Sequence, residues 1–273
     1  ATTTQGANLD LRQAFPDWDQ PCALIQTGTG FCPDGLFDEP LGELPFRRIA
    51  ALSTRPSPGG HDLVFRLGTI ADNQVLLVCG RRHLYEGLGM LPCVLPVCAG
   101  AMAGIRDIVL LSAAGGVRED LKPGILVALT DYINNLGTSP LTGNTDLAPG
   151  GFPDMTYAFS QELLGAFVNT AAEVGLVPRL GVYQANPGPQ FETPAEVDVA
   201  RRNGADVVGM SLVPETIAAR ALGCRVLGLA LVTNEAARRK GPPPRHQDVL
   251  EAAAYCSPLI VRALRQMLAG ENA

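Results

Sequence analysis

Three polar segments of the sequence carry residue types that bind a small anion. Thr29 offers a hydroxyl between two glycines, Arg81 offers a charged, forked set of N–H donors, and the small Ala113 leaves its backbone N–H accessible. The segments are Thr27–Gly30, Gly80–Gly87 and Ala113–Gly116, each after an apolar run: Ala23–Ile25, Val75–Cys79 and Ile108–Ser112. Taken singly, each residue also fits a turn, a packing position or the surface. Because all three come at the ends of apolar runs, together they predict a phosphate site.

A second group of residues has the chemistry to hold a polar heterocycle. Phe191 and Met210 can sandwich a flat ring, and Glu192 can accept a hydrogen bond from a ring N–H. Asn234 can both donate and accept. The same residues also fit structural roles, with Glu192 as a surface carboxylate, Phe191 and Met210 in the core, and Asn234 as a helix cap. Residue types alone leave both interpretations open.

Known nucleotide motifs do not fit these segments. Gly28 and Gly30 are followed by Phe31, Cys32 and Pro33, where a dinucleotide fingerprint needs its third glycine. The sequence also has no Gly-Lys-Ser/Thr phosphate loop. The expected anion is therefore a free phosphate or a small ester, not part of NAD or ATP.

Composition and charge exclude several classes of partner. The 273 residues are 47% hydrophobic and 18% charged, which is typical of a globular protein. With 21 basic and 27 acidic residues the net charge is −6, so no uniform basic field would hold nucleic acid or an anionic membrane. No segment approaches the ~20 apolar residues that cross a bilayer. The seven cysteines are odd in number and lack zinc-site spacing, so we expect no metal and a cytoplasmic location.

Apolar runs alternate with stretches of helical spacing, which predicts an α/β fold with a mainly parallel sheet flanked by helices. The expected strands are Ala23–Ile25, Val75–Cys79, Ile108–Ser112, Ile125–Leu129, Leu180–Tyr183, Asp206–Met210 and Val226–Val232. The expected helices cover 163–171, 217–222, a segment capped by Thr193 with Pro194 and Glu196, and 247–268, which Pro258 either kinks or divides. No repeat or linker divides residues 1–273, so we expect a single domain.

Taken together, these motifs resemble the trimeric branch of the purine nucleoside phosphorylase family, which also includes methylthioadenosine phosphorylase. Five motifs match in order: Gly80–Gly87, Ala113–Gly116, Gly188–Thr193, Gly209–Glu215 and Thr233–Asn234. The similarity runs from about residue 22 to residue 268. It implies a single domain with a mixed, mostly parallel sheet, and reversible cleavage of purine nucleosides by orthophosphate to free base and (deoxy)ribose 1-phosphate. It also implies that phosphate is a co-substrate and that no cofactor is needed.

The resemblance assigns a role to each candidate residue. Phosphate would be held by Thr29, Arg81, His83, Ala113 and Ser211, with His61 as a weaker candidate because it is displaced by about two residues from the family histidine. The base would be bound by Phe191, Glu192, Asn234, Ala114 and Gly115. The ribose would be bound by Tyr85, Met210 and His246, with Phe152 supplied by a neighbouring subunit of a homotrimer. The catalytic residues would be Asn234, Glu192 and His83.

Two residue types favour 6-oxopurine substrates. Hypoxanthine and guanine carry a hydrogen at N1 that Glu192 can accept, whereas adenine presents a lone pair there. An amide at Asn234, where the methylthioadenosine branch has aspartate, favours the same bases, and His246 suits a free 5′-hydroxyl. Inosine and guanosine are the expected substrates. The alternatives are a methylthioadenosine phosphorylase, a xanthosine-tolerant phosphorylase, a nucleosidase that uses water, and a nucleoside-binding protein without catalysis.

Overall fold

Nine strands form one mixed sheet in the computed structural model. The structure describes residues 11–28, 31, 33, 35–49, 52, 63–148, 150–237 and 246–270, with the side chains of residues 145 and 246–255 outside that description. The strands are β1 (Ala23–Gln26), β2 (Glu39–Pro45), β3 (Val64–Ile70), β4 (Asn73–Cys79), β5 (Asp107–Gly116), β6 (Leu126–Asn134), β7 (Arg179–Ala185), β8 (Val207–Gly209) and β9 (Arg225–Glu235). Their order is β2-β3-β4-β1-β5-β8-β7-β6-β9, and β9 also pairs with β5.

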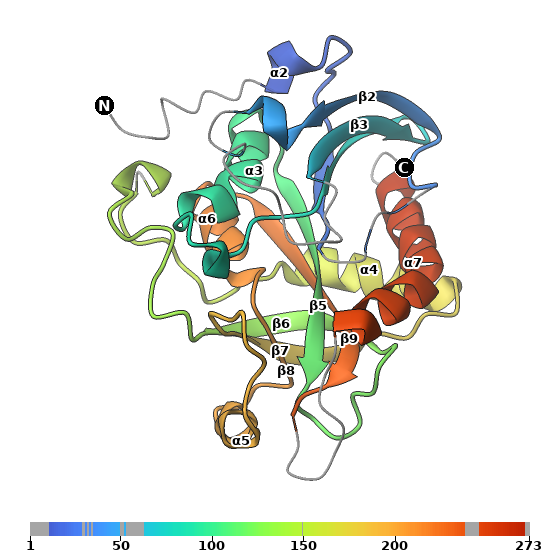
Figure 1. Cartoon of the computed structure of the whole chain (residues 1–273). Coiled ribbons are helices and arrows are strands. Elements are labelled where there is room, and N and C mark those ends of the chain that lie inside the picture. The colour runs from blue at the N-terminus through green and yellow to red at the C-terminus, as the bar shows by residue number, and fades with distance from the viewer. Residues whose placement is uncertain are drawn as a thin grey trace.

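The strand pairings confirm the mixed, mostly parallel α/β sheet. Strand β1 runs parallel to β4 and β5, β5 runs parallel to β9, and β7 runs parallel to β6 and β8. The antiparallel pairs are β2–β3, β3–β4, β5–β8 and β6–β9. Figure 1 shows β5 passing through the middle of the molecule, with β9 beside it.

Helices cover both faces of the sheet. They are α2 (Leu11–Ala14), α3 (Leu91–Met102), α4 (Gln161–Glu173), α5 (Pro194–Arg202), α6 (Val213–Ala221) and α7 (His246–Ala269), with 3₁₀ turns η1 (Phe46–Arg48), η2 (Leu84–Glu86) and η3 (Thr145–Leu147). In Figure 1, α3 and α6 lie on one side and α4 and α7 on the other. Successive strand residues point to opposite faces: Leu24 packs in the core that contains α3 and α6, and Ile25 in the core that contains α4 and α7. Strands that are apolar throughout are thus explained by burial on both faces.

All seven expected strands are present, but the sequence does not predict β2, β3, α2 or α3. Strand β2 contains Pro40 and Pro45 and is largely exposed, so it has no apolar run. Helix α3 contains Pro96 in its interior, and proline is a poor predictor of helix. One expectation was wrong in detail: Ala113–Gly116 does not follow a strand but forms the end of β5, because the backbone pairing of β5 with β9 continues to Gly116.

The structure tests the expected start of α5 and the expected course of the C-terminal helix. Helix α5 begins as expected, since the Thr193 hydroxyl accepts from the backbone N–H of Glu196 and the Glu196 carboxylate accepts from that of Thr193, at 3.3 and 2.7 Å. Glu192 is therefore the last loop residue before this capped turn.

Of the two alternatives for the C-terminal segment, the single helix is correct: α7 continues through Pro258. Within the described residues, no helix is both long and apolar enough to cross a membrane.

Candidate active site

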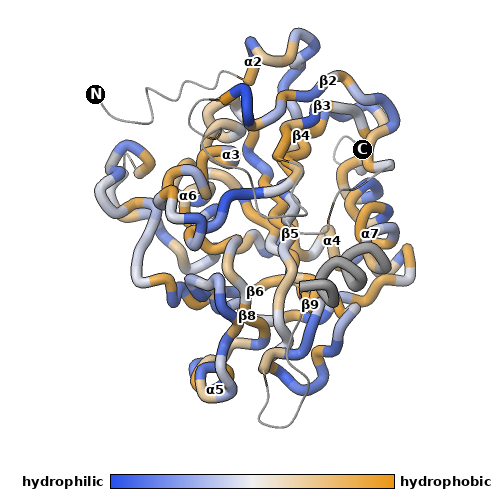
Figure 2. The backbone as a smooth tube through the Cα atoms, viewed as in Figure 1, coloured by the Kyte–Doolittle hydropathy of each residue, from blue (hydrophilic) through white to orange (hydrophobic). Residues whose placement is uncertain are grey.

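Arg81 lies two residues after the end of β4 and is buried, with an exposed fraction of 1%. Its Nη1 donates to the Ser211 hydroxyl at 3.0 Å, and its Nε lies 3.1 Å from a carboxylate oxygen of Glu215, which is equally buried. Among the described residues, Arg81 Nη2 has no hydrogen-bond partner. Figure 2 shows the hydrophilic segment that leaves β4 crossing toward α6, the helix that carries Glu215. A buried guanidinium with an open N–H is suited to bind an anion.

The position of the Arg81 side chain explains why a glycine is needed next to it. A methyl group on Gly28 would lie 2.9 Å from Arg81 Nη1, so any larger residue there would displace the guanidinium. On the other side, the hydroxyls of Ser112 and Ser211 are 2.9 Å apart, and the backbone N–H of Ser211 donates to the buried Tyr183 hydroxyl at 3.4 Å. Ser211, an expected phosphate residue, is thereby held from three directions.

His83 and Tyr85 follow Arg81 and form one wall of the site. Their rings stack at a centroid distance of 4.8 Å and an interplanar angle of 13°. Burial raises the pKa of Tyr85 to about 12, so its hydroxyl stays protonated at neutral pH. Glu86 holds the start of this turn: it accepts from the backbone N–H of His83 at 2.7 Å and from Arg82 Nη1 at 2.9 Å.

Glu86 makes the stability of this wall depend on pH. Burial favours its neutral form, but contacts with His83 and Arg82 outweigh burial, so its pKa lies below the ordinary value of 4.5. The charged form is therefore the one that the fold stabilises, and this stabilisation is present above pH 4.5 and lost as the pH falls through the lowered pKa. We expect the free energy of unfolding to fall less between pH 5 and pH 3 in Glu86→Gln than in the wild type. Urea titrations at several pH values measure this, with the exposed Glu119→Gln as control; parallel curves for Glu86→Gln and wild type would contradict it.

The loop before α5 packs against the wall that His83 and Tyr85 form. Gly188 has a φ of +64°, and a side chain there would overlap the sulfur of Met210 and lie 3.1 Å from the Tyr85 ring. The backbone N–H of Asn186 donates to the carbonyl of Gly209 at 2.8 Å, which ties the loop to β8. Met210 directly precedes Ser211, so this loop contacts the neighbour of a residue that Arg81 binds.

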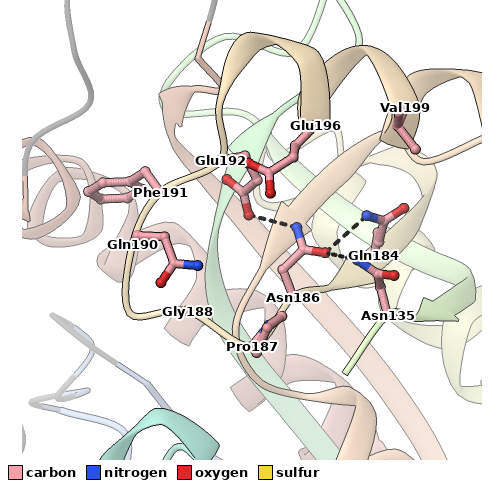
Figure 3. A pocket seen from close by; sticks show the side chains of 10 residues that line it. All are labelled: Asn135, Gln184, Asn186, Pro187, Gly188, Gln190, Phe191, Glu192, Glu196 and Val199. Atoms are coloured by element: carbon pink, nitrogen blue, oxygen red, sulfur yellow. Dashed lines mark hydrogen bonds between the residues drawn. The ribbon is translucent and has the colours of Figure 1, made fainter. Parts of the chain in front are cut away.

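Glu192 lines a pocket of about 250 Å³ at this loop. Its carboxylate is half-buried and accepts from Asn186 Nδ2 at 2.7 Å. Figure 3 shows Glu192 turned toward Asn186, while the Phe191 ring, 39% exposed, lies at the other side of the loop. Neither residue is in the core, so the interpretation of Phe191 as core filler is wrong.

Asn234 lies near the end of β9 and faces β5. Its Oδ1 accepts from the Thr233 hydroxyl at 3.2 Å, and its Nδ2 donates to the Glu235 carbonyl at 3.0 Å. Gly115 is its register partner on β5, and a methyl group there would lie 3.4 Å from Asn234 Nδ2. Since Asn234 is within a strand and α7 begins only at His246, the helix-cap interpretation is wrong.

Several expected residues are placed differently or fall outside the description. Thr29 and His61 lie outside the described residues, and of His246 only the backbone, at the start of α7, is described. Phe152 is fully exposed on the loop between η3 and α4. Ala113 and Ala114 lie within β5, next to Gly115. Within the described ranges, no three His, Cys, Asp or Glu side chains are grouped to hold a metal ion.

The sequence does not reveal the residues that position the predicted site residues through hydrogen bonds and ion pairs. Glu215 belongs to the Gly209–Glu215 motif, and its place four residues after Ser211 is the only feature of the sequence that points to it. In the sequence, Ser112 is recognisable only as the end of a strand, and Asn135 belongs to no motif. These residues act through contacts between distant segments: Ser112 with Ser211, and Asn135 with Asn186.

Comparisons with known proteins agree with this geometry. A model of the phosphorylase superfamily matches residues 32–269. The chain is 37% identical to purine nucleoside phosphorylase 1 of Geobacillus stearothermophilus over 92% of this chain and 90% of that protein. It is 42% identical to the purine nucleoside phosphorylase of Mycobacterium leprae over 78% and 76% of the two chains. The structure of Schistosoma mansoni purine nucleoside phosphorylase in complex with inosine superposes with a TM-score of 0.85, at 29% identity over 98% and 95% of the chains. The chain therefore belongs to the phosphorylase superfamily, among its purine nucleoside phosphorylases.

Proposed function

We propose that this protein catalyses the reversible phosphorolysis of 6-oxopurine (deoxy)ribonucleosides, with inosine and guanosine as substrates. The observation that carries the proposal is the buried Arg81, whose Nη2 has no partner among the described residues, together with the packing of the loop before Glu192 against Met210 and Tyr85. The relatives named above support it, because each is a purine nucleoside phosphorylase. Orthophosphate is the co-substrate, held by Arg81 and Ser211 with His83, Ala113, Thr29 and, more weakly, His61.

Phosphate supplies the nucleophile in the proposed reaction. A phosphate oxygen bonds to C1′ as the bond from C1′ to N9 breaks, and the electron pair of that bond leaves with the purine. The sugar passes through a positively charged, oxocarbenium-like state, which the phosphate anion stabilises from close range. The Arg81 guanidinium orients this anion, and its ion pair with Glu215 keeps the guanidinium in place. Tyr85 and Met210 line the ribose.

The purine leaves with negative charge, and Asn234 is proposed to stabilise it. A hydrogen bond from Asn234 Nδ2 to N7 strengthens as charge develops on the ring, so it favours the transition state over the ground state. The Thr233 hydroxyl donates to Asn234 Oδ1, and one N–H of the Asn234 NH₂ group donates to the Glu235 carbonyl, so the second N–H is the one that would donate to N7. Ala114, Gly115 and Phe191 complete the base side.

Glu192 is proposed to select bases that carry a hydrogen at N1. We expect Glu192→Gln to lower kcat/KM for inosine about 10–100-fold, the usual range for a lost hydrogen bond to a charged group. The effect on adenosine should be smaller, because its N1 is an acceptor that the glutamine NH₂ can reach. Steady-state kinetics on both nucleosides measure this. An unchanged ratio of the two kcat/KM values would contradict the assignment.

One experiment separates the proposal from its alternatives. Turnover of inosine, guanosine, adenosine, xanthosine and methylthioadenosine is measured with and without phosphate. Adenosine belongs in the panel because a Schistosoma mansoni relative was solved in complex with it. Phosphate-dependent cleavage of inosine and guanosine supports the proposal. Cleavage without phosphate indicates a nucleosidase, preference for methylthioadenosine or xanthosine indicates the respective phosphorylase, and binding without cleavage indicates a nucleoside-binding protein.

The proposal includes a homotrimer in the cytoplasm. Phe152, fully exposed in the single chain, is the residue that would cover the ribose of a neighbouring subunit. His246 would meet the 5′-hydroxyl from within the same chain. Analytical ultracentrifugation tests the trimer: a monomer with full activity would remove Phe152 from the site.

A further inference from the structure

Asn135, Gln184 and Asn186 form a hydrogen-bonded network that ends on Glu192. Asn135 Nδ2 and Gln184 Nε2 both donate to Asn186 Oδ1, at 2.9 and 3.0 Å. Asn186 Nδ2 in turn donates to Glu192 Oε1 at 2.7 Å. Figure 3 shows Asn186 between the Glu192 carboxylate on one side and the two amides of Asn135 and Gln184 on the other.

The network has a fixed direction. A carboxylate only accepts, so the NH₂ group of Asn186 must face Glu192. Its carbonyl oxygen then faces the opposite way and needs donors, which Asn135 and Gln184 supply. If Asn186 turned over, its carbonyl would meet the Glu192 carboxylate and its NH₂ group would meet two other NH₂ groups. The two rear amides therefore stabilise the single orientation in which Asn186 can donate to Glu192.

The surroundings make this arrangement rigid. Gln184 and Asn186 have exposed fractions of 3% and 8%, and Gln184 lies within β7. The backbone N–H of Asn135 donates to the Ala185 carbonyl at 3.0 Å, and that of Asn186 donates to Gly209. Because the amides are anchored to β6, β7 and β8, the position of Glu192 is set by the sheet as well as by its own loop.

We infer that Asn186 is a positioning residue that holds Glu192 as a charged acceptor aimed at N1–H of the purine, and that it thereby contributes to selecting 6-oxopurines. This inference rests on the proposed function. One oxygen, Oε1, is held from behind by Asn186, and the carboxylate thus keeps its other oxygen for the substrate.

A double-mutant cycle tests the inference. Asn186→Leu keeps the approximate size of the side chain but removes its hydrogen bonds, and it is measured alone and combined with Glu192→Ala. We expect Asn186→Leu to lower kcat/KM for inosine about tenfold, the lower end of the range for a hydrogen bond to a charged group, with a clearly smaller effect on adenosine. In the Glu192→Ala background the same substitution should change inosine turnover less than twofold. The exposed Asn169→Leu on α4 is the matched control and should leave both activities unchanged.

The outcomes separate the two claims. If Glu192→Ala leaves inosine turnover unchanged, the assignment of Glu192 in the proposed function fails. If Glu192→Ala lowers turnover but Asn186→Leu acts equally in both backgrounds, or lowers inosine and adenosine turnover alike, only the positioning role fails. Should Asn186→Leu not fold, the exposed Asn135→Leu replaces it, with the same non-additivity expected and a smaller effect. Additive effects of Asn135→Leu and Glu192→Ala would then overturn the inference.

Discussion

Replacing Asn234 with leucine is expected to lower kcat for inosine phosphorolysis about 10²–10³-fold, the typical cost of removing one donor from a site that stabilises developing negative charge. Leucine has a similar size but cannot donate to N7 of the departing purine. The loss should fall on kcat more than on binding, because the hydrogen bond gains its strength as charge moves onto the ring. Steady-state kinetics give kcat, and calorimetric titration of the variant with hypoxanthine gives the binding of the free base, which should be largely retained.

A graded control accompanies this prediction. Thr233→Val removes the hydroxyl that donates to Asn234 Oδ1 at 3.2 Å but leaves the amide itself in place. It should lower kcat by a smaller factor than Asn234→Leu, since the amide is less firmly oriented. Wild-type kcat in Asn234→Leu would remove Asn234 from the mechanism. An effect on hypoxanthine binding as large as that on kcat would mean that Asn234 contributes to binding and not to the transition state.

Much of the fold could be predicted from the sequence because local and global preferences agree. Ile25 and its neighbours lie in a strand buried on both faces, so an uninterrupted apolar run marks the strand. Thr193 and Glu196 complete a local capping box, which fixes the start of α5 whatever surrounds it. By contrast, Pro96 lies inside α3 among residues that are fully buried, so tertiary packing overrides a strong local signal against helix. The exposed, proline-containing β2 gave no pattern that differs from a loop.

The residues of the candidate site also fall into two groups, those that the sequence predicts and those that it does not. Arg81 lies two residues after β4 and Glu192 two residues before α5, where their chemical type is informative in sequence. The residues that hold them are far away in the chain: Glu215 is more than a hundred positions from Arg81, and Asn135 reaches Glu192 only through Asn186. No spacing rule connects such residues, because their contacts depend on the order of strands in the sheet. Sequence reasoning therefore identified groups expected to touch substrate and missed those that orient them.

Replacing Arg81 with methionine should both destabilise the protein and abolish its response to phosphate. Arg81 and Glu215 are each 1% exposed, so the substitution leaves a buried carboxylate without its partner, and breaking such a pair costs about 3–5 kcal/mol. In the wild type, phosphate at 100 times its Kd should add about 2.7 kcal/mol to the free energy of unfolding, because it binds only the folded state. The variant should show no such gain. Urea titrations with and without phosphate measure both effects.

Two further variants separate the ion pair from the anion site. Arg81→Met combined with Glu215→Leu removes both buried charges and should regain much of the lost stability, since a buried pair contributes little more than well-packed apolar residues. It should remain insensitive to phosphate, because the open guanidinium N–H is absent. Arg66→Met breaks a more exposed pair with Glu43 and should cost at most about 1 kcal/mol while leaving the phosphate response intact. If the double variant were stabilised by phosphate as strongly as the wild type, the anion would bind elsewhere. Arg81 would then serve only to neutralise Glu215 inside the fold.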